Sequence, residues 1–277
     1  MLLVLVLLQV CLCCLRLGST EVVTSFKGTC PQFFFGRTPP GDALEPDSAA
    51  RICQRYKNQY HYATLYDRNR RIPIYSAYLY QPSHGKRPNI WMVEPQLMGS
   101  SYPKEMEPEL TLMTMLNVSQ NEIKKSQAVF QDYKNLTNCN RGHLNPSGHQ
   151  PNPDSKASTF TLTNIVPQYE KLNGGQWNDY EKSVMATRTA DCANTYVVVG
   201  VVPGNNYIAK GRVNKPSHIW SAACCEVDNN HRRSWAVIAE NDKNAITLVT
   251  LGELEEQLTG LYHKGAVSLF HSDCPRN

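Results

Sequence analysis

The sequence predicts an α+β fold, a mainly antiparallel sheet flanked by a few helices. Most segments with a regular pattern are short runs rich in β-branched and aromatic residues bounded by turn residues, which is typical of strands. Two segments instead have the apolar spacing of a helix. Internal repeats and Gly/Ser linkers are absent from the sequence, so we expect residues 21–277 to form a single domain.

Composition sets broad limits on the class of protein. The chain has 277 residues, 41% of them hydrophobic, with 28 Lys and Arg against 24 Asp and Glu. This balance excludes a disordered tail or a collagen-like repeat, and the length is sufficient for a sizeable core. The net charge of +4 is compatible with a polyanionic partner but does not require one.

The first segment has the character of a secretory signal. Met1–Leu15 is almost wholly Leu, Val and Cys and ends at Arg16, too short for a spanning helix of about 20 residues. We therefore expect residues 1–20 to be removed, leaving a secreted, extracellular protein without stable membrane association. A retained anchor is the alternative, because no Lys or Arg precedes the apolar run.

Cysteine usage fits an oxidising compartment. Of ten cysteines, three lie in the predicted signal and seven remain, without Cys-x-x-Cys zinc spacing. The odd number leaves one thiol free or paired between chains. Cys224 and Cys225 are adjacent and would point to opposite faces of a strand, and we expect Cys30 to pair with Cys53. Two N-glycosylation sequons begin at Asn117 and Asn135.

The expected elements follow in chain order. Residues 28–47 are rich in Phe, Pro and Gly and predict an irregular wrap, and residues 81–108 predict mostly loop. Strands are expected at His61–Leu65, Ile72–Tyr80, Thr159–Val166 (ended by Pro167), Tyr196–Val202, His218–Cys224, Trp235–Ala239 and Ile246–Leu251. Helices are expected at Gln176–Thr189, with Trp177 in the core, and at Glu253–Tyr262.

The candidate site begins in the segment Asn140-Arg141-Gly142-His143. A histidine beside Gly and Arg is weak by itself, since most histidines are structural. Three further residues strengthen it: Asn164 at the end of a predicted strand, Asn173 before Gly174-Gly175, and Glu181 eight residues later in the predicted helix. The glycine pair places Asn173 in the lead-in to that helix rather than within it.

Together these features resemble the DNA/RNA non-specific endonuclease family, the ββα-metal (His-Me finger) nucleases marked by a D-R-G-H motif. The resemblance covers about Ala63 to Tyr262 and includes the strand Ile74–Tyr78 and the later segment Lys215–Trp220. It implies the ββα-metal fold and a metal-dependent endonuclease. Its substrates would be DNA and RNA, bound through the phosphate backbone and hydrolysed at phosphodiester bonds with little sequence specificity.

The resemblance also implies a role for each residue. His143 would activate the water, since imidazole is the natural base near neutral pH. Mg²⁺ (or Mn²⁺) would be bound directly by the side-chain oxygen of Asn173 and through water by Glu181. Asn164 would position the site, and Arg141 would stabilise charge in the transition state. His149 is left outside the site.

The chain departs from the family pattern at several places. Asn140 stands where the motif has Asp, which removes a charge beside the site. Leu79 and Met185 stand where some members have arginines. Candidates to replace those arginines are Arg70, Arg71 and Arg188.

The departures keep an alternative open: a catalytically weakened or inactive descendant that binds nucleic acid or a protein partner. A disulfide-stapled adhesive ectodomain is a further alternative and predicts no metal dependence. A serine hydrolase, a phosphate-loop protein and a zinc protease are disfavoured, because the sequence has no Gly-x-Ser-x-Gly, no Gly-rich phosphate loop and no His-Glu-x-x-His.

Overall fold

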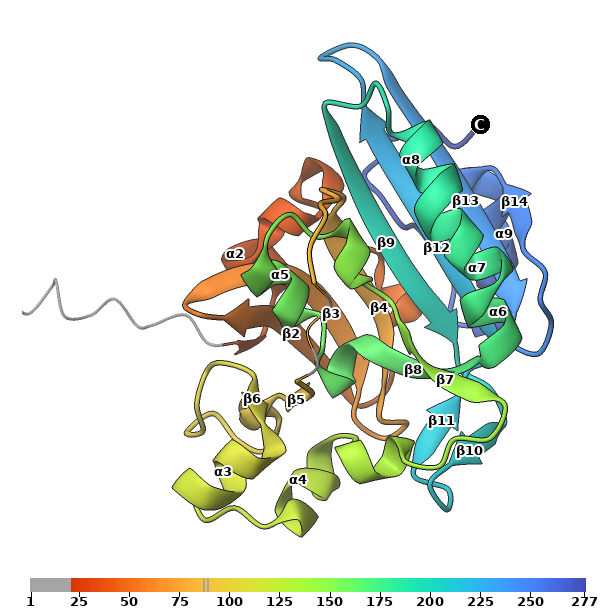
Figure 1. The fold of residues 1–277 in the computed structure, drawn as a ribbon. Helices are drawn as coiled ribbons and strands as arrows, with labels where there is room; N and C mark the ends of the chain where they lie inside the picture. Colours follow the sequence, from red (N-terminus) through yellow and green to blue (C-terminus); the bar gives the residue numbers. More distant parts are fainter. Residues whose placement is uncertain (1–20, 87, 89) are drawn as a thin grey trace, which may run out of the picture.

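The computed structural model describes residues 21–86, 88 and 90–277, so the predicted signal segment lies outside the described residues. An eight-stranded antiparallel sheet forms its centre, in the order β1–β2–β3–β4–β9–β12–β13–β14 (Figure 1). The strands are β1 Val22–Val23, β2 Ala49–Tyr56, β3 Gln59–Asp67, β4 Ile72–Leu79, β9 Asn194–Val202, β12 His218–Glu226, β13 Arg232–Glu240 and β14 Thr247–Val249.

Three two-stranded ribbons and several short helices complete the fold. The ribbons pair β5 Met92–Val93 with β6 Glu107–Pro108, β7 Cys139–His143 with β8 Ile165–Tyr169, and β10 Asn206–Ile208 with β11 Val213–Lys215. The helices are α2 Phe26–Thr29, α3 Glu109–Met115, α4 Gln120–Ser126, α5 Pro153–Ser158, α6 Glu170–Gly174, α7 Gln176–Asp179, α8 Met185–Arg188 and α9 Leu251–Tyr262. Within the described residues, no helix combines the length and the apolar character needed to cross a membrane.

The sheet has an apolar core on each face, because successive side chains of a strand alternate in direction. In β9, Val197, Val199 and Val201 pack on the face covered by α6, α7 and α8, while Val198 and Val202 pack on the face covered by α9 and the amino-terminal segment (Figure 1). β9 therefore contributes side chains to the apolar cores on both faces of the sheet. The β7–β8 ribbon lies on the face of α6–α8.

Two predicted elements differ from the structure. The segment Thr159–Val166 is not one strand: residues 162–164 form a 3₁₀ turn and β8 runs from Ile165 through Pro167 to Tyr169. Pro167 is tolerated inside β8 because this strand pairs only with β7, leaving the other edge open where no backbone N–H is required.

The second difference lies at the start of α9. The predicted strand Ile246–Leu251 is shortened to Thr247–Val249, and the helix begins at Leu251 rather than Glu253. Thr250 caps it: its hydroxyl accepts a hydrogen bond from the Glu253 backbone N–H, and the Glu253 carboxylate accepts one from the Thr250 N–H. The capping box was present in the sequence and marks the boundary.

Three disulfides cross-link the described chain. Cys30–Cys53 is present as predicted. Adjacent cysteines of β12 serve opposite faces of the sheet, since Cys225 pairs with Cys192 beside α8 and Cys224 pairs with Cys274 in the carboxy-terminal tail. Among the described cysteines, Cys139 is the buried free thiol.

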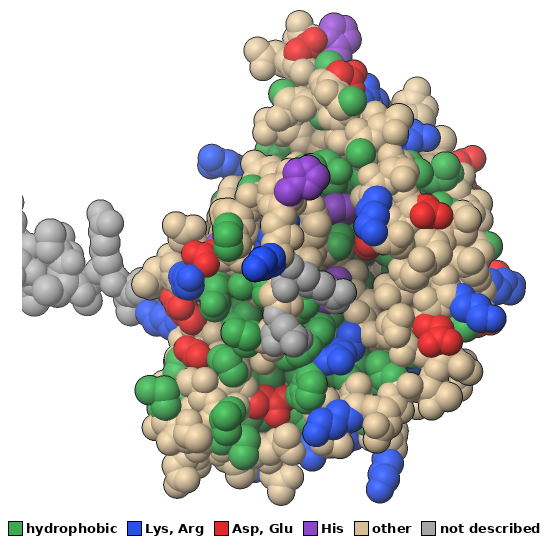
Figure 2. Space-filling view, viewed as in Figure 1, with side chains coloured by type: hydrophobic (Ala, Val, Ile, Leu, Met, Phe, Trp, Pro, Cys, Tyr) green, Lys and Arg blue, Asp and Glu red, His purple; other side chains and the backbone are tan. Residues whose placement is uncertain are grey.

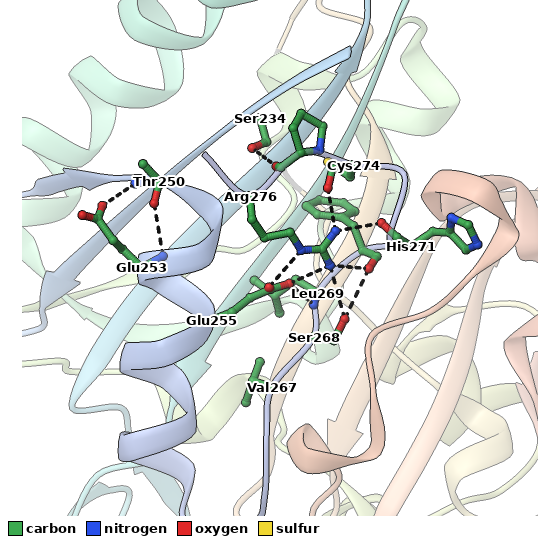
Figure 3. Close-up of polar contacts among 12 residues, drawn as sticks. Ser234, Thr250, Glu253, Glu255, Val267, Ser268, Leu269, His271, Cys274 and Arg276 are labelled. Atoms are coloured by element: carbon green, nitrogen blue, oxygen red, sulfur yellow. Dashed lines mark hydrogen bonds and ion pairs between the residues drawn. The ribbon is translucent and has the colours of Figure 1, made fainter. Parts of the chain in front are cut away.

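The carboxy-terminal tail is fastened to α9 by Arg276 (Figure 3). The guanidinium donates hydrogen bonds to both carboxylate oxygens of Glu255, each at 3.1 Å. It also donates to the backbone carbonyls of Phe270, His271 and Cys274. Leu269 adds a backbone N–H to the Glu255 carboxylate at 2.7 Å. Arg276 and Glu255 thus link the tail to α9, in addition to the Cys224–Cys274 disulfide that links it to β12.

Candidate active site

The site is built from the β7–β8 ribbon and the helical segment that follows it. Arg141 and His143 are two residues apart on β7, so their side chains share one face of the ribbon. Gly142 lies between them and faces Gln168 of β8. A Cβ at Gly142 would come within 2.1 Å of the Gln168 side-chain oxygen, so the motif requires glycine here.

Aromatic rings hold the two side chains. The imidazole of His143 packs against Trp91 and Phe160, with ring centroids at 5.6 and 4.9 Å. The guanidinium of Arg141 lies over Trp91 at 4.7 Å and over Phe130 at 5.1 Å from the ring centroids. Trp91 touches both, and sequence reasoning missed it because it lies in a stretch predicted as loop. An aromatic residue inside an otherwise polar loop was the available signal.

Asn164 is fully buried and does not line the cavity described below. Its side-chain oxygen accepts hydrogen bonds from the Ser76 hydroxyl and the Asn145 N–H, both at 3.0 Å. Its amide nitrogen donates to the carbonyls of Asn145 at 2.9 Å and Thr159 at 3.0 Å. Asn164 therefore fixes the turn that follows His143, which is a positioning arrangement without direct access to a ligand.

Asn173 lies in α6, a five-residue helix. The lead-in predicted for this residue is therefore itself helical, which corrects the expectation that Asn173 lies outside helix. Gly175 breaks the segment before α7, and a Cβ there would come within 2.6 Å of the Lys171 carbonyl oxygen. The backbone of Gly175 is non-helical, and on either side of this break Asn173 and Glu181 line the same cavity.

Glu181 occupies a π-helical turn, Tyr180–Val184, between α7 and α8. Such turns shift the register of a helix and recur at functional sites. One carboxylate oxygen accepts a hydrogen bond from the Trp177 indole N–H at 3.0 Å. Burial raises the pKa of Glu181 to about 7, although this hydrogen bond and nearby Lys182 act in the opposite direction.

His149 contacts the site although the sequence placed it outside. Its two ring nitrogens lie 2.9 Å from the Tyr78 hydroxyl and from the Glu181 backbone carbonyl oxygen. Burial lowers the pKa of His149 to about 4, so the ring is neutral near pH 7. Through its contact with the Glu181 carbonyl, His149 therefore helps to hold the backbone of the π turn in place.

A cavity of about 720 Å³ joins these elements. Figure 2 shows His and basic side chains (purple and blue) grouped near the middle of this face. Glu181 is the acidic residue in the lining, against the basic Arg141 and Lys182, so the cavity favours an anion. The lining residues are Tyr80, Pro82, Ser83, His84, Arg141, His143, Pro146, Ser147, Gly148, His149, Asn173, Asn178, Glu181, Lys182 and Ala186.

The proposed replacement arginines lie outside this lining. Arg70 forms an ion pair with Asp67 at 2.9 Å, Arg71 donates to backbone carbonyls, and Arg188 lies over the ring of Trp235. Lys182 instead supplies the second cation of the cavity, one residue after Glu181.

The three departures from the motif differ in their surroundings. Met185 is fully buried in the core and Leu79 is half-buried on β4. Asn140 is exposed, and because it directly precedes Arg141 on β7 its side chain points to the opposite face of the strand from Arg141 and His143. A charge at residue 140 would therefore be screened by solvent.

The donor set fits a hard cation that keeps most of its waters. Asn173 offers an amide oxygen and Glu181 a carboxylate on the wall of one cavity, and oxygen ligands of this kind suit Mg²⁺ or Mn²⁺. No group of three or more His, Cys, Asp or Glu that could hold a metal occurs in the described part of the chain. A fully protein-ligated site of zinc type is thus not found there.

Comparisons with known proteins identify the family of the chain. Residues 39–269 match the DNA/RNA non-specific endonuclease family. The human Endonuclease domain-containing 1 protein is 32% identical over 236 residues, 83% of this chain and 45% of that protein. The mouse protein of the same name is 30% identical over 254 residues, 89% of this chain and 48% of that protein. The chain spans about half the length of these relatives.

A solved structure shares the fold. The crystal structure of the EndoG/EndoGI complex, which concerns EndoG inhibition, superposes with a TM-score of 0.54 and 17% identity. The match covers 85% of this chain and 91% of that one. The antiparallel sheet with its β7–β8 ribbon and following helix is therefore a ββα-metal nuclease fold, as the sequence predicted.

Proposed function

Because the chain belongs to the DNA/RNA non-specific endonuclease family, we propose that it is a metal-dependent endonuclease that hydrolyses phosphodiester bonds of DNA and RNA with little sequence specificity. One observation carries the proposal. A single cavity with an anion-favouring lining contains Arg141 and His143 from β7, Asn173 from α6 and Glu181 from the π-helical turn, although Asn173 lies thirty residues after His143 in the chain.

In this proposal the chain's own residues position the scissile phosphate and move one proton. Arg141, held over Trp91 and Phe130, binds phosphate oxygens through its planar fork. His143, fixed by the rings beside it, takes a proton from the attacking water. Arg141 then faces the charge that develops on the phosphoryl oxygens.

Asn173 would hold the divalent cation directly through its side-chain oxygen, and Glu181 would hold it through water. When bound, the cation supplies charge neutralisation at the phosphate and at the departing 3′ oxygen. A cation bound there would favour the ionised carboxylate and so oppose the rise in the pKa of Glu181 that burial causes. Trp177 orients that carboxylate by its indole N–H.

The proposal includes secretion. Three disulfides fit an oxidising compartment, and the sequon residues Asn117 and Asn135 are both exposed, as glycan acceptors must be. We propose an extracellular protein without stable membrane association after signal removal. Its nucleic-acid partner would be bound through phosphates, so cleavage should weaken as salt rises.

The test is digestion of plasmid DNA and total RNA by the secreted protein with Mg²⁺ or with EDTA. We expect cutting of both that EDTA abolishes. His143→Ala should lower the rate by about 10²–10⁴-fold while circular dichroism stays unchanged. His231→Ala is the matched control, because His231 is exposed and pairs with Asp228 away from the cavity.

Undiminished cutting by His143→Ala would remove this residue as the base. Absence of cutting by folded wild type with Mg²⁺ would reject the enzyme and favour the alternative, a protein that binds nucleic acid or a protein partner. Filter binding of labelled DNA and RNA to the same preparation identifies that outcome.

A further inference from the structure

An exposed apolar surface lies on α3, apart from the candidate site. Seven large hydrophobic side chains of the described residues are exposed, and four of them belong to α3 and the residue that caps it. Figure 2 shows hydrophobic side chains (green) on this part of the molecule, at the lower left. The described lining of the cavity around His143 includes no residue of α3. The four side chains, with their exposed fractions, are Leu110 (69%), Met113 (39%), Met115 (77%) and Leu116 (45%).

The contacts of α3 hold the helix in this orientation. Leu112 is its buried residue and belongs to the core that also contains Ile123. The carboxylate of Glu109 accepts hydrogen bonds from the Phe130 backbone N–H and, at 3.0 Å, from the Gln120 side-chain amide. The exposed side chains therefore cannot turn into the core unless these contacts break.

A glycosylation sequon begins at the end of this surface. Leu110 and Met113 are three residues apart and share one face of the helix, and Asn117 follows four residues after Met113. The backbone of Asn117 is left-handed, with φ of +50°, and the Val118 N–H turns back to the Leu112 carbonyl oxygen at 3.4 Å. Asparagine is one of the residues that end helices in this way. The turn keeps the exposed Asn117 next to the end of α3.

The second sequon has polar neighbours and provides a comparison. Asn135 is exposed, and so are Lys134, Thr137 and Asn138 beside it in the chain. Among the described residues, none of the exposed large hydrophobic side chains belongs to the segment 130–140. An apolar helix face therefore adjoins one of the two sequons along the chain and not the other.

We propose that an N-linked glycan on Asn117 covers the apolar surface of α3 and prevents the protein from self-associating through it. The proposal rests on the proposed secretion, because such glycans are added in the secretory pathway. In that step Nδ2 of Asn117 loses a proton and forms a bond to the first sugar of an oligosaccharide. The bond between that sugar and its lipid-linked diphosphate donor breaks, and the lipid diphosphate leaves with the electron pair.

A glycan suits this surface because it is bulky, hydrated and attached at one end of it. The C–H faces of its first sugars can pack on leucine and methionine side chains, while its hydroxyl groups remain in water. Exposed apolar patches otherwise mark contact with another molecule or a tendency to aggregate. The glycan would thus keep an extracellular protein monomeric without any change in its fold.

The test variant Ser119→Asn removes the sequon without changing Asn117. Ser119 caps α4 by accepting a hydrogen bond from the Glu122 N–H at 3.2 Å, and asparagine caps helices equally well. The substitution also adds no charge. Thr137→Ala is the matched control, because it removes the sequon of Asn135 at an exposed residue.

Wild type and variants are secreted from cultured eukaryotic cells, and peptide mass spectrometry reports the modification of Asn117 and Asn135. Hydrophobic-interaction chromatography and analytical ultracentrifugation then measure exposed apolar surface and self-association. We expect Ser119→Asn to elute later than wild type, with a mass that rises toward that of a dimer as concentration increases. Thr137→Ala should behave as wild type. Adding Leu110→Ser to Ser119→Asn should restore the wild-type elution.

An unmodified Asn117 in the secreted protein would overturn the proposal, and so would equal elution of Ser119→Asn and Thr137→Ala. Self-association of the glycosylated wild type that Leu110→Ser abolishes would identify a second copy as the occupant of α3 and also overturn it. Retention of the protein inside the cells would reject the proposed secretion and this proposal with it. DNA cleavage by the purified variants tests the proposed activity separately, and we expect equal rates because α3 lies outside the cavity lining.

Discussion

Two glutamates of this molecule are partly buried on helical segments on opposite faces of the same sheet. They differ in the number of hydrogen bonds that their carboxylates accept. Glu255 of α9 receives two hydrogen bonds from Arg276 and a third from the Leu269 N–H. Glu181 receives one, from the Trp177 indole N–H. A carboxylate that holds the fold together is saturated by the chain itself, whereas the carboxylate at the cavity retains capacity for a ligand.

The largest expected effect separates the two residues by activity. Glu181→Gln keeps the shape but weakens the hold on the cation, so we expect the rate of DNA cleavage to fall about 10–100-fold and the Mg²⁺ requirement to rise. Glu255→Gln should leave the rate per folded molecule unchanged. Rates at several Mg²⁺ concentrations measure both variants. Equal losses would show that the two carboxylates do not differ in function.

For stability, we expect the larger effect on the side of Glu255, where the carboxylate holds the tail. Arg276→Ala removes the charged partner of Glu255 and three carbonyl contacts of the tail, and we expect a loss of about 2 kcal/mol, or roughly 4–8 °C in melting temperature. Lys243→Ala is the control, since its ion pair with Glu240 is more than half exposed on both sides. Denaturant unfolding measures the difference. A loss no greater than that of the control would mean that the tail is not fastened by this arginine.

A smaller effect on activity is expected at Trp91, which supports two site residues without binding a ligand. Trp91→Ala removes the ring under Arg141, an interaction worth about 0.5–2 kcal/mol, so cleavage should fall roughly 3–30-fold. Trp91→Phe keeps a ring and should recover most of the rate. Steady-state kinetics on a DNA substrate test this. Failure of phenylalanine to recover more rate than alanine would argue against the role of the ring.

The smallest effect is on the pH dependence of stability without metal. Glu181 has a raised pKa, so its contribution is present below about pH 4.5 and is lost as pH rises toward 7. His149 has a lowered pKa, so its contribution is present above about pH 6.5 and is lost as pH falls toward 4. The contributions of Glu181 and His149 to stability therefore change in opposite directions with pH. Glu181→Gln should remove the first and retain the contribution of His149.

Melting temperature measured in EDTA from pH 4.5 to 7 tests this cancellation. We expect the melting temperature of Glu181→Gln, relative to wild type, to increase steadily over that interval. A constant difference between the two curves would indicate that Glu181 titrates as an ordinary surface glutamate.

Much of the site could be predicted from sequence, because the motif and its spacing carry local information. Arg141, His143, Asn173 and Glu181 all line one cavity, as their family spacing implied. Asn164 was expected to position the site, and the structure gives it buried contacts to the following turn. Arg141, His143, Asn164 and Asn173 each lie near a strand end or a glycine, whereas Glu181 was found by its spacing from Asn173.

Other contributions could not be predicted because they depend on contacts between distant segments. Trp91 contacts Arg141 across fifty residues of chain, and its place as an aromatic residue in a polar loop does not show which residue it contacts. His149 was set aside because its partners, Tyr78 and the Glu181 carbonyl, meet it only in the folded state. The π turn at Glu181 is likewise invisible to helical periodicity.

The two adjacent cysteines of β12 have a consequence for oxidative maturation. Cys225 ties the strand to the loop after α8, and Cys224 ties it to the tail that Arg276 fastens. The layer that contains the candidate site and the opposite layer are thus each bonded to β12 by a disulfide, at cysteines one peptide bond apart. Exchange of partners between these neighbouring sulfurs would bring the tail to the wrong face of the sheet. Correct packing of both layers therefore depends on each cysteine forming its own pair.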